Sequence, residues 1–132
     1  MSDNFVALET PRSKVELIGA ALDQTFGRSS TSGSHREAVR GTLFGENKIK
    51  LVYDIRQNFP LNYNLHDIKA NLEAAGRKAF NVELARLKKS LKDDFSESVS
   101  FKELSCTNDL QIFSFTNVNR QGRFVMECIL EF

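Results

Sequence analysis

Residues 64–93, NLHDIKANLEAAGRKAFNVELARLKKSLKD, decide the fold. Their apolar side chains recur at spacings of three, four and eight positions, which places them on one side of an α-helix. Asn64 can cap the first turn, and Asp67 stands where the helix dipole favours an anion. We predict one helix, roughly 45 Å long at 1.5 Å per residue, with a buried stripe made of Leu65, Ile68, Leu72, Phe80, Leu84, Leu87 and Leu91.

Gly76 falls on this stripe. An interior glycine costs a helix about 1 kcal/mol relative to alanine, so its presence calls for a structural reason. It indicates either a close approach of another backbone or a kink, and the sequence leaves both interpretations open.

The C-terminal third predicts a β-meander. Its three segments are SVSFKEL (98–104), LQIFSFTNV (110–118) and RFVMECILEF (123–132), joined by SCTND and NRQG. The last segment alternates clearly, and the middle one has apolar residues on both faces, as a central strand would. The apolar row of the last strand consists of Phe124, Met126, Cys128, Leu130 and Phe132.

The first half of the chain predicts a helix, a loop and a hairpin. Residues 11–26 have helical periodicity, with Ser13 and Glu16 spaced as in a capping box. Residues 27–36, GRSSTSGSHR, lack aliphatic side chains and predict a flexible loop. Residues 38–56 predict a hairpin around the turn GEN, although 34–39 could instead form a short helix.

Together these elements predict a single α+β domain over residues 1–132. We expect a five-stranded, mainly antiparallel sheet, formed by the hairpin and the C-terminal meander, with two helices packed on one face. The expected order is α-β-β-α-β-β-β.

Composition excludes several classes of protein. Eighteen basic and seventeen acidic residues leave a net charge of +1, so no global field attracts nucleic acid. No stretch has the 18 or more apolar residues of a membrane span, and the first residues do not form a secretory signal. We therefore expect a cytoplasmic protein, or one assembled into a particle built in the cytoplasm, with no membrane partner.

The sequence carries no recognisable catalytic, cofactor or metal motif. Its two histidines, His35 and His66, are 31 positions apart, and no serine lies in a GxSxG context. We expect Cys106 and Cys128 to lie on neighbouring strands as free buried thiols, with a disulfide as the alternative. We predict no catalytic, cofactor-binding or metal-binding residue, and we favour a non-enzymatic protein.

Two surfaces are candidates for binding. Apolar residues off the main stripes indicate a partner surface, which would consist of Phe113, Phe115, Val125, Ile129 and Phe132. The end of the long helix is basic and could contact phosphates through Arg86, Lys88, Lys89 and Lys92.

The leading hypothesis is a protein–protein interaction or assembly module, such as a subunit of a viral, phage-type or bacterial complex or a homo-oligomer. It would act through its sheet and its terminal strand, with Phe132 largely buried. The first alternative is a small-ligand pocket protein or small enzyme, with a pocket lined by Phe101, Tyr53 and Met126. The second alternative is nucleic-acid binding through the basic end of the long helix.

Overall fold

The computed structural model describes residues 13–25, 28–32, 35–62 and 64–132, of which residues 28–32 and 35 are described by their backbone alone. The elements follow the order α1 (Lys14–Thr25), β1 (Arg28–Ser32), β2 (His35–Leu43), β3 (Lys48–Pro60), α2 (Leu65–Phe95), β4 (Lys102–Phe115) and β5 (Asn119–Glu131). The strands form one sheet in the order β1-β2-β3-β5-β4, and every neighbouring pair is antiparallel. The predicted α+β class, with two helices and an antiparallel sheet, is confirmed.

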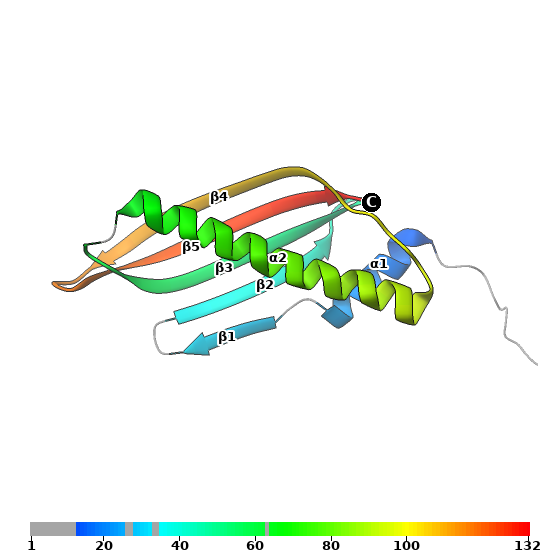
Figure 1. Ribbon diagram of the computed structural model, residues 1–132, viewed down its shortest axis with the longest axis horizontal. Coiled ribbons are helices and arrows are strands. Elements are labelled where there is room, and N and C mark those ends of the chain that lie inside the picture. Colours follow the sequence, from blue (N-terminus) through cyan, green and yellow to red (C-terminus); the bar gives the residue numbers. More distant parts are fainter. Residues whose placement is uncertain (1–12, 26–27, 33–34, 63) are drawn as a thin grey trace, which may run out of the picture.

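Helix α2 is the long helix predicted from the apolar stripe. It crosses the sheet diagonally (Figure 1). The side chain of Asn64 accepts a hydrogen bond from the backbone N–H of His66, as the predicted cap requires. Ser96 ends the helix in the left-handed conformation, with φ 55°. The stripe is buried at Ile68, Leu72, Phe80, Leu87 and Leu91, whereas Leu84 is half-buried and Leu65 is exposed.

Gly76 lets α2 approach the sheet closely. A Cβ atom at this position would lie 3.0 Å from the sulfur of Met126 and 3.0 Å from a ring carbon of Tyr53. Side chains of the sheet, and not another backbone, therefore make the close approach at Gly76. Both Tyr53 and Met126 are fully buried beneath α2.

Strands β3 and β5 supply the sheet side of the core. Alternate residues of β3, such as Leu51 and Tyr53, are buried under α2, and so is the apolar row of β5. The Tyr53 hydroxyl donates to a carboxylate oxygen of Glu37 at 2.7 Å. Burial, first of all, and this acceptor raise the pKa of Tyr53 far above its ordinary value, so the hydroxyl stays protonated.

Helix α1 extends the same core toward β2. The predicted capping box is present, because the Ser13 hydroxyl and backbone N–H both donate to the Glu16 carboxylate and the Glu16 N–H donates to Ser13. Ile18, Ala21 and Leu22 are buried in the single core cluster. Both helices therefore lie on one side of the sheet, which we call the covered face (Figure 1).

The predicted meander was partly wrong. Segments 98–104 and 110–118 do not form two strands, because residues 102–115 make the single long strand β4, which includes the supposed turn SCTND. Polar residues in SCTND resemble a turn, but they fit an edge strand: Asn108 faces α2 and donates to Glu73, and Thr107 is exposed. The five predicted strands thus correspond to only four strands of the structure.

The remaining strand, β1, lies within the segment predicted as a loop. Residues 28–32 pair with β2, and β2 begins at His35, so most of 27–36 is strand and the alternative helix at 34–39 is wrong. Backbone pairing needs no aliphatic side chain, which is why composition missed it. The flexibility of this segment stays a prediction, and the observed order is α-β-β-β-α-β-β.

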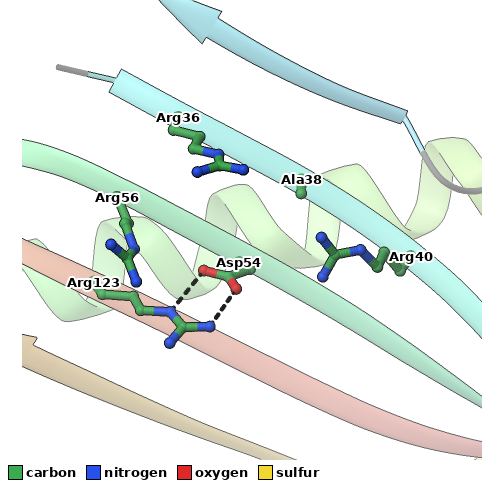
Figure 2. Close-up of a pocket in the computed structure, with 6 residues that line it drawn as sticks. All are labelled: Arg36, Ala38, Arg40, Asp54, Arg56 and Arg123. Carbon is green, nitrogen blue, oxygen red and sulfur yellow. Dashed lines mark hydrogen bonds and ion pairs between the residues drawn. The ribbon is translucent and has the colours of Figure 1, made fainter.

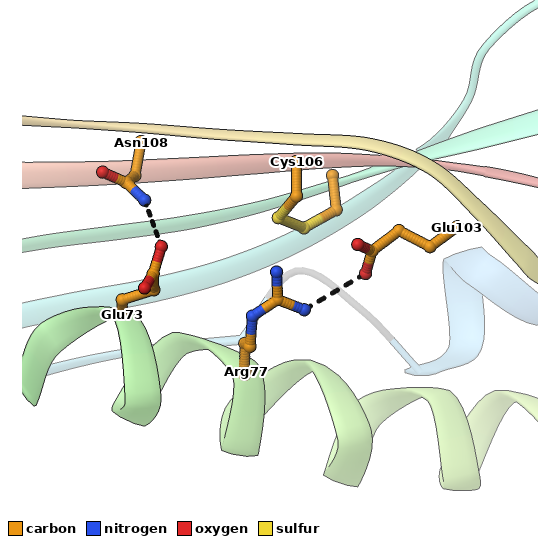
Figure 3. The surroundings of a disulfide bond; sticks show 6 residues. Glu73, Arg77, Glu103, Cys106 and Asn108 are labelled. Atoms are coloured by element: carbon orange, nitrogen blue, oxygen red, sulfur yellow. Dashed lines mark hydrogen bonds and ion pairs between the residues drawn. A yellow bond between two sulfur atoms is a disulfide. The ribbon is translucent and has the colours of Figure 1, made fainter. Parts of the chain in front are cut away.

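A disulfide joins Cys106 of β4 to Cys128 of β5, so the expectation of free thiols is corrected (Figure 3). The two residues are direct partners in the antiparallel register, with Cα atoms 4.1 Å apart. This register, which the sequence could not supply, brings the sulfur atoms together.

Across the described residues, no helix combines the length and the apolar character that crossing a membrane would require.

Candidate functional site

The side of the sheet opposite the helices, which we call the uncovered face, carries most of the candidate binding chemistry. Residues that pair directly across antiparallel strands point to the same side of a sheet. Asp54 of β3 pairs with Ala38 of β2 and Val125 of β5, and its neighbours Tyr53 and Ile55 point into the core. Asp54, Ala38 and Val125 therefore lie on the uncovered face.

A hollow of about 250 Å³ opens on this face between β2, β3 and β5. We call it the arginine hollow, and Figure 2 shows its side chains gathered around Ala38 and Asp54. Arg36, Ala38 and Arg40 are alternate residues of β2, and Arg56 and Arg123 are direct partners across β3 and β5. The lining consists of Arg36, Ala38, Arg40, Asp54, Arg56 and Arg123.

Asp54 and Arg123 form a two-pronged ion pair in the hollow. The Arg123 Nε donates to Oδ1 of Asp54 at 3.0 Å, and its Nη2 donates to Oδ2 at 2.6 Å. These hydrogen bonds are the main cause that lowers the pKa of Asp54, and the charges of Arg40 and Arg56 lower it further against the opposing effect of burial. Asp54 is therefore ionised at neutral pH.

The remaining arginines of the hollow have no ion pair with an acidic residue among the described residues. In the part of the chain that the structure describes, Arg36 and Arg40 form no ion pair, and Arg56 only stacks against the ring of Phe113, 5.9 Å from its centroid. Four guanidinium groups thus share one carboxylate. The hollow is strongly positive in a chain whose net charge is only +1.

Exposed apolar side chains gather next to the hollow, at the turn between β4 and β5. Phe113, Phe115 and Val118 expose 54%, 70% and 74% of their surface. We call these three residues the hairpin tip. Phe113 connects the tip with the hollow through its contact with Arg56. Exposure of this extent within six residues is typical of a binding surface.

Val125 and Ile129, two further residues of the predicted partner surface, lie half-buried on the uncovered face. Each stands opposite a charged residue of β3, Val125 opposite Asp54 and Ile129 opposite Lys50. Lys50 also approaches Glu127 at 3.8 Å. This middle part of the face therefore mixes charged and aliphatic groups and forms no continuous apolar patch.

Phe132, the last residue of that predicted surface, lies elsewhere. Its ring packs edge-on against Phe101, with centroids 6.2 Å apart, and its N–H donates to the carbonyl of Asn47. It is half-buried at the border of the core, less deeply than predicted. We exclude it from the candidate site.

The basic end of α2 does not form a compact cluster. Arg86 and Lys88 flank the buried Leu87 on either side of the helix, and Arg86 pairs with Glu83 at 3.1 Å. Lys89 pairs with Asp93. Only Lys88 and Lys92 of the four predicted phosphate contacts have no ion-pair partner among the described residues.

One group of possible metal ligands lies on the covered face beside the disulfide. Glu103, Cys106 and Cys128 have ligand atoms within 4.8 Å of one another. The sulfurs are joined to each other, however, and the Glu103 carboxylate accepts from Arg77 at 3.2 Å (Figure 3). Because metals bind thiolates, the oxidised pair offers no site.

Sequence reasoning missed the arginine hollow. The alternation of KIKLVYDIR placed Asp54 and Arg56 on the outer face of a strand, which was the available signal. Arg36 had been placed in a loop, and the alignment of Arg123 with Arg56 depends on the register between strands 67 residues apart. Neither fact can be derived from periodicity.

Comparison of the chain with known protein families, with curated proteins and with solved structures gave no match.

Proposed function

We propose that this chain is a non-enzymatic interaction module that binds another protein through its uncovered face and hairpin tip. The carrying observation is the exposure of Phe113, Phe115 and Val118 beside four arginines. Aromatic residues and arginine are the types enriched in protein interfaces, and lysine and glutamate are depleted there. A subunit of a multiprotein complex, such as a viral, phage-type or bacterial one, is the setting that this surface suits.

The charge of the surface favours a different chain over a second copy as the partner. In a two-fold symmetric dimer through this face, the same patch would meet itself, so two arginine hollows would approach each other. Like charges placed together at an interface cost several kcal/mol, by the usual estimate. We therefore expect a partner that presents acidic and apolar groups side by side.

Selection of random peptides displayed on phage tests this proposal without knowledge of the natural partner. We expect the selected peptides to combine acidic and apolar residues. Their binding should fall at least tenfold when Phe115 and Val118 are both changed to Ser, because the tip supplies the apolar contact. Fluorescence anisotropy with one synthetic peptide measures the change.

The matched control removes two exposed apolar residues elsewhere, with Val82→Ser on α2 and Leu104→Ser on β4, which are 47% and 44% exposed. This variant should bind the peptide like the wild type. Equal losses for both double variants would contradict the proposal. So would a stable dimer in light scattering that only the tip variant dissociates, because the partner would then be a second copy.

A cytoplasmic location belongs to the same proposal, and the Cys106–Cys128 disulfide counts against it, because such bonds are rare in the reducing cytosol. Trapping of free thiols in cells that express the chain tests the location. Full alkylation of both cysteines would support the cytoplasm, and complete protection would place the chain in an oxidising compartment.

A further inference from the structure

The arginine hollow combines an unmatched positive charge with open space. Four guanidinium groups and one carboxylate line it, and the carboxylate is already engaged by Arg123. A volume of about 250 Å³ leaves room for a small ligand above the strands. A ligand that completes the charge balance would be an anion with more than one negative charge.

Ala38 creates the space. It stands between Arg36 and Arg40 on the same side of β2 and opposite Asp54 of β3. Every other residue that lines the hollow has a longer side chain, so we assign its floor to the methyl group of Ala38, which Figure 2 shows between Arg36 and Arg40 on β2. The hollow therefore depends on a small residue at position 38.

The arginines suit an oxyanion. A guanidinium group presents several N–H donors in a plane that matches the oxygens of carboxylate and phosphate. Arg123 already holds Asp54 in this manner. Arg36 and Arg40 have no ionic partner in the described part of the chain, so their donors remain available to a ligand.

The surroundings favour one anionic group over a polyanion. Nucleic-acid surfaces carry basic residues along the whole track of the backbone. Here Val125 and Ile129 continue the face along β5, with Glu127 between them and Asp109 of β4 opposite Val125. Lys50, the basic residue opposite Ile129, approaches Glu127, so carboxylates interrupt any basic track for a chain of phosphates.

We propose that the arginine hollow binds a single phosphate monoester or free phosphate. One source of this phosphate is a phosphorylated side chain of the partner protein, and only this source rests on the proposed function. The other possible source is a small phosphate compound.

Calorimetric titration with inorganic phosphate and with the peptide Gly-Gly-phosphoserine-Gly-Gly tests the site, with the unphosphorylated peptide for comparison. We expect saturable binding of at least one phosphate probe and none of the unphosphorylated peptide. Tighter binding of the phosphopeptide would assign the ligand to a partner protein. Equal or tighter binding of inorganic phosphate would assign it to a small molecule.

Two variants locate the site by independent means. Arg36→Gln with Arg40→Gln removes two donors, and Ala38→Leu fills the floor without any change of charge. Both the double arginine variant and Ala38→Leu should bind phosphate at least tenfold more weakly than the wild type does. Circular dichroism checks that each variant is folded, and if Ala38→Leu fails to fold, the arginine pair decides alone.

The matched control is Lys88→Gln with Lys92→Gln, which removes two positive charges from α2 that have no ion-pair partner among the described residues, and it should leave phosphate binding unchanged. An equal loss in this control would show general electrostatic attraction and overturn the site. Tighter binding of a twelve-residue oligothymidine than of the phosphopeptide, retained in the arginine variant, would also overturn it. The tip variant Phe115→Ser with Val118→Ser should bind phosphate normally, so failure of the partner surface and failure of the phosphate site are distinguishable.

Discussion

The two faces of this sheet are built from the same strands but differ in chemistry: one is apolar and packed against the helices, and the other is charged and open. On β5, Phe124 is fully buried under α2, and the next residue, Val125, is half-buried on the uncovered face between charged neighbours. The covered face is continuous and apolar along β3 and β5, whereas the uncovered face carries the arginine hollow and mixed side chains. The packed core therefore lies on one face, and the other face remains open to solvent.

The largest difference between the faces should appear when neighbouring residues of β5 are truncated. We expect Phe124→Ala to lower the free energy of unfolding by about 3–5 kcal/mol, because it opens a cavity in a packed core. Val125→Ala should cost less than about 1.5 kcal/mol, because its methyl groups are only partly removed from water. Urea denaturation of both variants measures these losses in the free energy of unfolding. Equal losses would mean that the two faces contribute equally to stability.

The edge strand β4 differs from the central strand β3 because none of its residues is fully buried. Its attachment depends on hydrogen bonds to β5, on polar contacts with α2 such as Asn108–Glu73, and on the Cys106–Cys128 bond between residues 22 positions apart. Changing both cysteines to Ala should cost about 3 kcal/mol, mainly because the unfolded chain gains freedom. Hydrogen exchange should show earlier opening of β4 than of β3, and equal protection of the two strands would contradict this view.

Alanine substitutions at Gly122 and Gly19 compare a tightly packed position with a loosely packed one. A Cβ atom at Gly122 would lie 2.8 Å from Ile112 Cδ1 and 2.9 Å from the backbone oxygen of Gln111, so Gly122→Ala should cost about 1–3 kcal/mol. At Gly19 the nearest atom belongs to the partly exposed Leu43 side chain, at 3.1 Å. Because Leu43 can move and alanine favours a helix, Gly19→Ala should stabilise the fold by about 0.5–1 kcal/mol. Thermal denaturation should give midpoint shifts of opposite sign.

The smallest effect should come from the ion pair on the uncovered face. The pKa of Asp54 is lowered in the folded protein, so its contribution to stability is present above the ordinary pKa of about 3.9 and is lost as the pH falls below it. Asp54→Asn should cost up to about 1 kcal/mol at pH 7. The difference from the wild type should shrink as the pH falls from about 5 through the ordinary carboxyl pKa and on toward the lowered pKa of folded Asp54. A difference independent of pH would assign the cost to packing.

The sequence by itself determined the elements whose signal is local. Periods of 3.6 and 2 predict the stripe of α2 and the alternation of β3 and β5, and both are present in the structure. Residue type and spacing predict the caps at Ser13 and Asn64, which are also present. The apolar residues at 113 and 115 could also be identified as exposed candidates from the same patterns.

Only the tertiary structure decided how the strands pair. β1 and β4 contain polar residues that are typical of loops, and they become strands because neighbouring backbones offer hydrogen bonds. The same pairing joins Cys106 to Cys128 and gathers Arg36, Arg40, Arg56 and Arg123 around Ala38. Register between segments that are distant along the chain leaves no periodic trace in either segment, so the disulfide and the arginine hollow had to come from the fold.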